Sequence, residues 1–398
     1  MNEFLGILDA VVGEAISPDT AAVAIAVIGL NIHFGFTGLL NIGQAGYMLL
    51  GAYGMAISIT YDIPLAVAVL IGLVVSVLFS LILGLPTLKL RGDYLAIVTI
   101  SAAEIIRYTG RLAAFEDFTG GSQGIFGKDY QGPFMDLSFF GSGSFDLLPL
   151  NYRDAGGGAA LRVVGLLVAV AAIAGIVVIA KRMKAADGEA PKVGTTATPK
   201  LIMAALGVVL FLALFFSFPQ TEPRTSVDGW WVRVVAWSLV GVSCIIVFLL
   251  VRSPWGRLLR GIREDEEAMR SLGKNVFAIK MQALIIGGMF GALGGMVYVL
   301  TGSVQADSMG RQLTFFAYTA LLLGGAATIF GPVLGSIIFF SARILVRELS
   351  GAYVPNSIMS TQQTEQFSYV VVGVALVLLV IFRPQGILGN KRELRFHV

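Results

Sequence analysis

Long apolar runs are the feature that most constrains the fold of this chain. Residues 64–87 and 282–301 are two of several runs that reach the roughly 20 residues needed to cross the hydrocarbon of a bilayer. Apolar residues make up 56% of the 398 and charged residues only 13%, whereas a soluble domain carries about 25% charge. A large soluble protein with a very apolar core is the alternative, but the run lengths favour a polytopic membrane protein.

We predict an all-helical bundle of about nine spans in a single transmembrane domain over residues 1–398. The spans are placed at about 20–40, 43–60, 64–87, 94–111, 160–180, 201–218, 232–251, 282–301 and 367–382. Residues 314–347 are also apolar, but Gly324-Gly325 and Gly331-Pro332 disrupt a continuous helix. This stretch is predicted to form two short helices, a re-entrant hairpin that enters and leaves by one membrane face.

The distribution of Lys and Arg predicts the orientation, because cytoplasmic loops carry an excess of both. The basic stretches between the spans fall on one side if the N-terminus is outside and the C-terminus inside. Residues 113–158 are then an extracytoplasmic segment, 181–200 a cytoplasmic linker and 253–280 a cytoplasmic loop. Arg343 and Arg347 lie in the predicted hairpin, and we expect them to pair locally, for instance with Glu348.

Several classes of function are excluded by the sequence. The net charge of +3 is spread along the chain without a basic stripe, so no nucleic-acid partner is expected. The single Cys244 excludes a disulfide within the chain, and the two histidines cannot build a metal site. There is no G-x-x-x-x-G-K-[ST] loop for ATP and no Ser/His/Asp set, so we predict neither a cofactor nor an enzyme. No basic n-region precedes the first span, so no cleavable signal peptide is expected.

Residues 253–280 form a charged island between two apolar runs. Leu258, Leu259, Ile262, Met269 and Leu272 keep a rough helical rhythm among its charges, which predicts a short amphipathic element that presses into a groove on a soluble partner. Glu267-Ala268-Met269 is followed after three residues by Gly273, and a glycine there lets the chain turn sharply. The alternative is a solvated loop with an incidental helix.

Small residues recur in the run that follows the island. Gly287, Gly291 and Gly295 lie every four residues, a spacing that lets helix backbones approach closely in lipid. Tight packing is the simpler interpretation. The functional one adds that such helices can slide or rock, as alternating access requires.

Polar residues within the predicted spans are few. Glu104 and Arg107 lie one helical turn apart, and a charge near mid-membrane costs about 2.5–3.5 kcal/mol, so they are expected to pair. They are either part of a path for a zwitterionic solute or a structural pair near a wet helix end. Asn31, Asn41 and Gln44 likewise either line a path or bond across helices.

Six segments in this order resemble the branched-chain amino acid ABC permeases, and the LivM type rather than its LivH-type partner. They are residues 29–47 (Gly-Leu-Asn-Ile-His-Phe-Gly-Phe-Thr-Gly-Leu-Leu-Asn-Ile-Gly-Gln-Ala-Gly-Tyr), 92–107, 119–125 (Thr-Gly-Gly-Ser-Gln-Gly-Ile), 256–266, 324–335 and 383–388 (Arg-Pro-Gln-Gly-Ile-Leu). The spacing of Glu267, Ala268 and Gly273 is similar to the Glu-Ala-Ala loop of ABC importers.

The resemblance implies a translocation subunit in the inner membrane of a prokaryote. Its partners would be a LivH-like second permease, two ATPase subunits that bind ATP and Mg, and an extracytoplasmic solute-binding protein. The island would then transmit movement from an ATPase, and the residues implied in this coupling are Arg257, Arg260, Arg263, Glu264, Asp265, Glu267, Ala268, Leu272 and Gly273.

Other functions stay open from the sequence. Related permeases of the superfamily serve urea and short amides. An ion-coupled secondary transporter would need an acidic residue in the membrane, for which Glu104 is the candidate. A membrane subunit without transport activity is a third possibility. Residues 126–158 and 181–230 look longer than the family needs.

Overall fold

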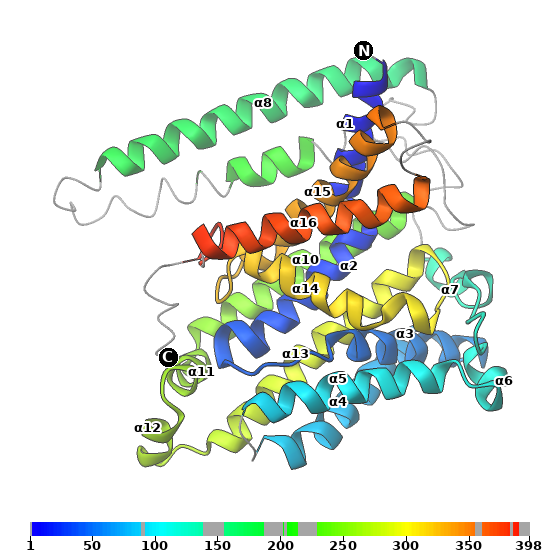
Figure 1. The fold of residues 1–398 in the computed structure, drawn as a ribbon, viewed down its shortest axis with the longest axis vertical. Helices are drawn as coiled ribbons and strands as arrows, with labels where there is room; N and C mark the ends of the chain where they lie inside the picture. Colours follow the sequence, from blue (N-terminus) through cyan, green and yellow to red (C-terminus); the bar gives the residue numbers. More distant parts are fainter. Residues whose placement is uncertain are drawn as a thin grey trace. The chain divides into compact units, whose positions relative to one another are not determined.

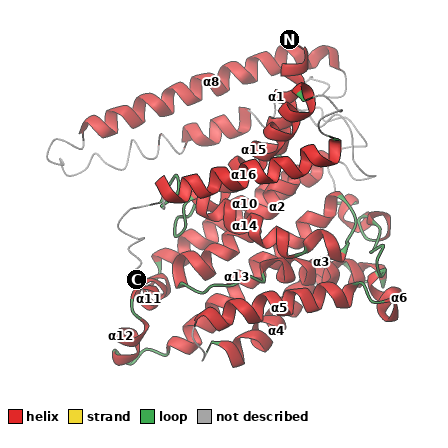
Figure 2. Ribbon diagram, viewed as in Figure 1, coloured by secondary structure: helices red, strands yellow, loops and turns green. Residues whose placement is uncertain are grey.

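The computed structural model describes residues 2–88, 92–137, 155–186, 202, 205–213, 229–354, 360–382 and 385–389. The chain forms two compact units, one of Met1–Ser138 with Pro223–Val398 and one of Phe139–Glu222. The described residues are helical with no strand, apart from one isolated bridge between Ile125 and Val304 (Figure 2). The predicted all-helical class is confirmed.

The larger unit holds most of the helices, drawn in Figure 1. In chain order they are α1 (Asn2–Ala15), α2 (Pro18–Leu30), the π-helix η1 (Asn31–Phe36), α3 (Gln44–Thr60), α4 (Leu65–Thr87), α5 (Gly92–Gly110), η2 (Ala113–Phe115), α6 (Glu116–Thr119), η3 (Gly127–Asp129), α7 (Gly132–Met135), α10 (Gly229–Arg252), α11 (Pro254–Glu264), α12 (Glu266–Ser271), α13 (Val276–Tyr298), η4 (Val299–Thr301), η5 (Ala306–Met309), α14 (Arg311–Gly324), α15 (Gly331–Tyr353) and α16 (Thr361–Phe382). The smaller unit contains α8 (Ala155–Ala186).

Four helical stretches among the described residues are long and apolar enough to cross a membrane. They are Gly6–Phe36, Leu65–Thr87, Trp231–Arg252 and Val276–Thr301. Helices α3, α5, α8 and α16 lie where four further spans are predicted. Residues 187–200 of the predicted linker, residues 201, 203–204 and 214–218 of the predicted span 201–218, and residues 138–154 of the outer segment lie outside the described residues.

The first predicted span differs from the structure at both ends. A separate helix, α1, precedes it, and the helix that follows ends at Phe36 rather than near residue 40. At the end of the non-helical segment that follows, side chains accept the backbone N–H groups. Ile42 donates to Thr99 Oγ1 at 3.0 Å and Gly43 donates to Asn41 Oδ1 at 2.9 Å.

The break predicted within residues 314–347 is confirmed, because α14 ends at Gly324 and α15 begins at Gly331. The two helices approach so closely that a Cβ on Gly335 would lie 1.8 Å from the carbonyl oxygen of Ala320. The expectation that both helices are short is wrong for α15, which runs for 23 residues. Its charged end is stabilised by partners on α1 and α16, described below.

Helix α13 packs against α2, α3 and α4 at the centre of the larger unit (Figure 1). Glycine makes these contacts possible, since a Cβ at Gly295 would lie 1.9 Å from the carbonyl oxygen of Met48 in α3. Toward α2, Gly294 would meet the carbonyl oxygen of Ala22 at 2.6 Å. Backbones in direct contact fix these three helices relative to one another.

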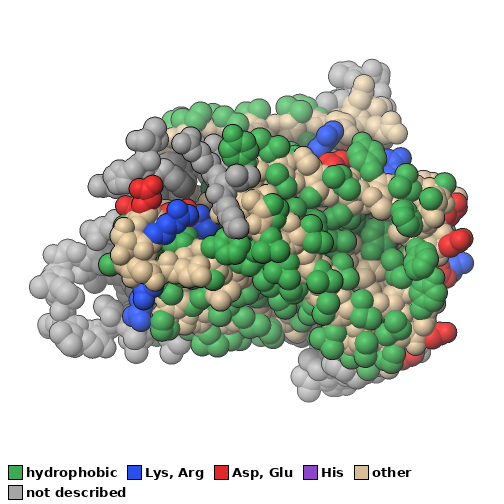
Figure 3. Space-filling model, turned by 90° about the horizontal axis from the view of Figure 1, so that it is seen from below, with side chains coloured by type: hydrophobic (Ala, Val, Ile, Leu, Met, Phe, Trp, Pro, Cys, Tyr) green, Lys and Arg blue, Asp and Glu red, His purple; other side chains and the backbone are tan. Residues whose placement is uncertain are grey.

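Charged side chains gather toward two opposite ends of the face drawn in Figure 3, and the surface between them is mostly hydrophobic. Exposed apolar side chains of α4 and α5, such as Leu70, Ile82 and Ile105, contribute to the apolar surface of the unit. A broad apolar surface bounded by charge is what a lipid-facing protein requires.

Candidate functional site

Helix α11 opens the charged island and lies against the bundle of its own chain. It begins at Pro254 directly after Ser253, and Gly256 packs so closely on the end of α10 that a Cβ would lie 2.2 Å from the carbonyl oxygen of Val251. Leu259 and Ile262 are buried. The apolar ridge that the sequence assigns to a partner is therefore largely used within the chain, because these two residues cover the bundle.

Helix α12 is defined by its two caps. Asp265 is the N-cap, and its carboxylate accepts the N–H of Ala268 at 2.9 Å. At the other end Gly273 has φ +74, its N–H bonds to the carbonyl of Arg270, and Lys274 N–H bonds to that of Met269. This pair of bonds is a Schellman motif, which favours glycine in the left-handed position. The sharp turn expected at Gly273 is thus observed.

The outer surface of the island is charged. The large apolar side chain exposed on this surface is that of Leu272, at 71%. The other exposed residues among those implied in coupling are Arg257, Arg260, Glu264, Asp265, Glu267, Ala268 and Gly273. A partner that met this surface would meet mixed charge around a single leucine.

Arg263 differs from its neighbours because its guanidinium points back into the bundle. It donates to the carbonyl oxygen of Gly35 in η1. Its side chain also covers the turn that follows η1, where a Cβ on Gly38 would lie 3.4 Å from Arg263 Cγ. Arg263 therefore links the island to the helix that carries Asn31.

Sequence reasoning missed the ion pairs that brace α12. Glu266 bonds to Arg270 at 2.6 Å and also pairs with Lys280 in the first turns of α13. The spacing of four residues could have indicated the first pair. The second joins two helices across a turn, and no local spacing indicates it.

Asn31 lies at the start of η1 and is 1% exposed. Its Nδ2 donates to the carbonyl of Thr328 at 2.7 Å, and its Oδ1 accepts the N–H of Ala327 at 2.8 Å. Both partners belong to the turn between α14 and α15. The Asn31 amide therefore holds that turn against η1.

His33, Asn41 and Gln44 form a second buried polar group. Asn41 Nδ2 lies 3.0 Å from His33 Nδ1 and 3.2 Å from Gln44 Oε1. His33 Nε2 lies 3.0 Å from the carbonyl oxygen of Leu284, which can only accept, so Nε2 carries the proton. Gln44 Nε2 donates to the carbonyl of Ala26 at 3.0 Å. In this conformation the three side chains join α2, α3 and α13.

Glu104 and Arg107 pair as expected, at 2.8 Å on α5. The structure adds Asp307 of η5, which pairs with Arg107 and with Arg111, the latter at 3.2 Å. Asp307 lies 200 residues from Arg107, so no sequence spacing indicates it. The four side chains join the end of α5 to the segment before α14.

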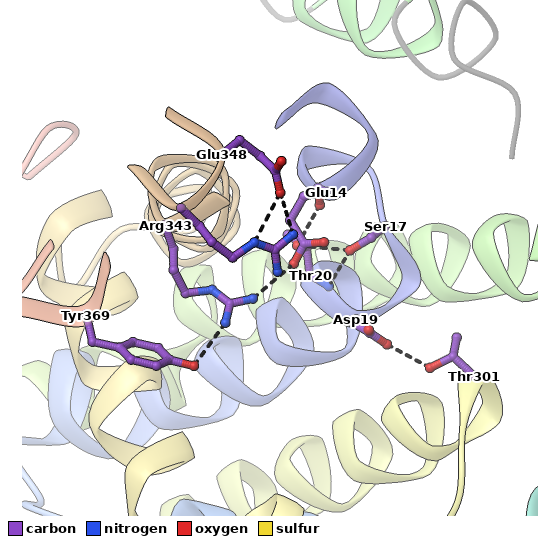
Figure 4. Close-up of polar contacts among 9 residues, drawn as sticks. Glu14, Ser17, Asp19, Thr20, Thr301, Arg343, Glu348 and Tyr369 are labelled. Carbon is purple, nitrogen blue, oxygen red and sulfur yellow. Dashed lines mark hydrogen bonds and ion pairs between the residues drawn. The ribbon is translucent and has the colours of Figure 1, made fainter. Parts of the chain in front are cut away.

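One arginine of α15 pairs within the helix, and another contacts α1 and α16 (Figure 4). Arg347 pairs with Glu348 at 2.7 Å, as the sequence predicts. Arg343 instead lies 3.6 Å from Glu14 of α1 and donates to the hydroxyl of Tyr369 in α16 at 3.0 Å. This polar cluster ties three helices together.

The glycines at four-residue spacing all lie at close contacts of α13. A Cβ at Gly287 would lie 2.3 Å from His33 Nε2, and one at Gly291 would lie 2.7 Å from Gln44 Nε2. Gly295 abuts Met48, as described above. The glycine seam and the buried polar group therefore occupy the same interface.

A pocket of about 490 Å³ lies in the segment after α5. It is lined by Thr60, Glu116, Asp117, Phe118, Gly120, Gly124, Ile125 and Asp129. Nearby, burial raises the pKa of Tyr130, whose hydroxyl donates to the carbonyl of Val299 at 2.6 Å. Within the described part of the chain, no three His, Cys, Asp or Glu side chains are grouped to hold a metal ion.

A family model described as the permease component of the branched-chain amino acid transport system matches residues 15–380. The chain belongs to this family. The match covers the island, the glycine seam and the broken hairpin, and together with the long apolar helices it indicates a multi-pass membrane protein. No solved structure matches it.

Curated relatives agree with the family. The LivM protein of the high-affinity branched-chain amino acid transport system of Escherichia coli is 27% identical over 320 residues, 78% of this chain. A probable LivM protein of Methanocaldococcus jannaschii is 26% identical over 168 residues, 41% of this chain. A guanosine ABC transporter permease of Bacillus subtilis is 28% identical over 183 residues, which is 38% of this chain and 56% of that protein. The chain spans about half the length of the two LivM proteins, 54% and 48%.

Proposed function

We propose that this chain is the LivM-type permease subunit of an ATP-driven importer of branched-chain amino acids. The observation that carries the proposal is the charged island. Helix α12 stands exposed between a carboxylate cap and a Schellman turn, while Arg263 beside it binds the bundle. Such an element can be held by a partner and still transmit a displacement inward.

The work would come from two partner ATPases that bind ATP and Mg. Their closure would carry α12 with them, and the bundle would change the side on which the solute path is open. This chain would supply the exposed charges, the Leu272 contact and the two caps of α12. It would hold no cofactor of its own.

The same proposal assigns the remaining partners and the orientation. A LivH-like permease would complete the translocation path, and LivH of Escherichia coli is itself 25% identical to this chain over 208 residues. An extracytoplasmic binding protein would deliver the solute. The island and the C-terminus would face the cytoplasm, the N-terminus the exterior, and the membrane would be the inner one.

The test is charge reversal at Glu264, which is exposed and caps no helix. In vesicles containing the complex of permeases and ATPases, Glu264→Lys should lower leucine uptake at least tenfold while ATP hydrolysis continues. The matched control is Asp136→Lys, the same charge reversal at an exposed residue outside the island, which should leave uptake unchanged. Uptake at the wild-type rate by Glu264→Lys, at equal abundance in the vesicles, would contradict the proposal.

The solute requires its own experiment, since the guanosine permease is also similar to this chain. The cognate binding protein should be titrated with leucine, isoleucine, valine, urea, acetamide and guanosine. Tight binding of the three branched amino acids alone supports the proposal, and binding of urea, acetamide or guanosine instead reassigns the solute.

An ion-coupled transporter without an ATPase is the weaker candidate. Its ion site would be Glu104, but that carboxylate accepts two hydrogen bonds from Arg107, at 3.0 and 2.8 Å. An ion bound at Glu104 would therefore have to displace this arginine.

A further inference from the structure

The π-helix η1 lies between the charged island and the turn of the α14–α15 hairpin. It continues α2 for six residues, from Asn31 to Phe36, with the wider turns of a π-helix. Because the helix ends there, the carbonyl of Gly35 is free to accept a side-chain donor. Arg263 of α11 supplies that donor.

Besides its contact with Arg263, η1 contacts the turn between α14 and α15 through the side-chain amide of Asn31. It makes one bond as donor, to Thr328, and one as acceptor, from Ala327, so both its oxygen and its nitrogen bind the backbone of the turn. Asn31 is buried, and through these two bonds it joins η1 to the turn.

The two contacts meet at one residue. The carbonyl of Gly35 accepts from Arg263, while a Cβ on Gly35 would lie 1.9 Å from Asn31 Oδ1 and 2.7 Å from the N–H nitrogen of Ala327. A displacement of the Gly35 backbone by Arg263 therefore presses directly on the Asn31 amide and on the turn.

The turn itself has a backbone that depends on its neighbours. Ala327 has φ +60 and Gly325 has φ +111, and a side chain other than that of glycine is disfavoured at such angles. On its other side the tail segment 385–389 binds the end of α14, where Ile387 and Leu388 donate to the carbonyls of Leu323 and Gly324, both at 3.0 Å. The strained turn is thus held from two sides, and η1 is one of them.

We propose that η1 passes the movement of α11 to the α14–α15 turn, with Arg263 receiving it and Asn31 delivering it. Both are positioning residues, since neither needs to touch the solute. The inference rests on the proposed function, because a partner ATPase would supply the movement.

The experiment measures two displacements in the purified complex with its ATPases. Cys244 is replaced by alanine, and nitroxide labels are placed in pairs on a reference position, Leu70 of α4, and on either Glu267 of α12 or Phe330 of the turn. All three positions are exposed. Electron paramagnetic resonance then gives each distance without nucleotide and with ATP plus vanadate.

In the unmodified background we expect nucleotide to shift both distances. In Asn31→Ala the shift at Glu267 should persist and the shift at Phe330 should disappear, and leucine uptake should fall at least tenfold while ATP hydrolysis continues. Arg263→Ala should give the same pattern, and Arg263→Lys, which keeps a donor for Gly35, should restore most of the Phe330 shift. Because Arg263 is only half-buried, these two variants decide the question even if Asn31→Ala does not fold.

The control is Thr301→Val, which removes the hydrogen bonds of Thr301 Oγ1 to Asp19 at the far end of α2, at 2.8 Å, and to the carbonyl of Tyr298, at 3.3 Å. It should leave both shifts unchanged. A Phe330 shift that survives in Asn31→Ala and Arg263→Ala overturns the relay and leaves the proposed function intact. A relay is equally excluded if Phe330 does not move in the unmodified background while Glu267 does. Absence of any nucleotide-dependent shift at Glu267 overturns both proposals.

Discussion

Helices α12 and α13 are neighbours in the chain and are stabilised in opposite ways. Helix α12 has no buried residue and depends on the Asp265 cap, the Gly273 turn and ion pairs of Glu266. Helix α13 has fourteen buried residues, and several of its glycines touch the backbones of α2 and α3.

The difference separates a part that can be moved from a part that resists change. Each cap or exposed ion pair contributes about 1 kcal/mol or less, so α12 can respond to a partner at small cost. Interlocked backbones cannot separate without losing many contacts at once. The predictions below test this contrast in order of decreasing effect.

The largest effect is expected at Gly295. A Cβ there would lie 1.9 Å from the carbonyl oxygen of Met48, so Gly295→Ala must push α13 away from α3, at a cost of about 3 kcal/mol. The measurement is the amount of folded chain in the membrane and its midpoint of thermal unfolding in detergent. Gly241→Ala in α10 is the matched control, because nothing lies within 4 Å of its added Cβ, and equal behaviour of the two variants would refute the seam.

A smaller effect is expected at Gly273, where an added Cβ also meets nothing within 4 Å but φ is +74. Gly273→Ala should loosen the end of α12 by about 1–2 kcal/mol, since a left-handed alanine is strained. Gly273→Asn should cost less, because asparagine tolerates this conformation. Amide hydrogen exchange in α12 measures the change. Equal protection of α12 from exchange in Gly273→Ala and in the wild type would show that the turn does not stabilise the helix.

The N-cap is expected to contribute about 1 kcal/mol. Asp265→Ala removes the acceptor for Ala268 N–H, so α12 should fray while the thermal midpoint of the whole chain stays unchanged. Hydrogen exchange of Glu266–Ser271, compared with that of α13, gives the result. Fraying that spreads into α13 would mean that the two helices are not separable.

The smallest effect is expected from the ion pair between Glu266 and Lys280. Lys280→Met keeps the aliphatic stem and removes the charge, and it should cost about 0.5 kcal/mol because Glu266 is part-exposed. The difference from wild type should shrink at 0.5 M salt if it is electrostatic. A salt-independent difference would assign the effect to packing of the stem instead.

The sequence predicts features whose causes are local. Gly273 follows the end of α12, and the break between α14 and α15 lies between Gly324 and Gly331. Both could be predicted because the conformations open to a glycine depend on that residue and its immediate neighbours. The pair of Arg347 with Glu348 is local as well.

Features that depend on the assembled bundle could not be predicted. Helical rhythm groups Leu259 with Ile262 but does not say what covers them, and the structure places them against the bundle. The partner of Arg107 lies 200 residues away. The π-helix could not be predicted either, because the Arg263 and Asn31 contacts on it join distant segments.

The tail segment 385–389 has a consequence for the order in which the protein is completed during synthesis. The last carbonyls of α14 accept N–H groups from Ile387 and Leu388, more than sixty residues later in the chain. Helix α14 therefore leaves the ribosome well before its last carbonyls can be capped, because α15 and α16 must emerge before residues 387 and 388 do. The turn that binds Asn31 is consequently among the last parts of the nascent chain to reach its final form.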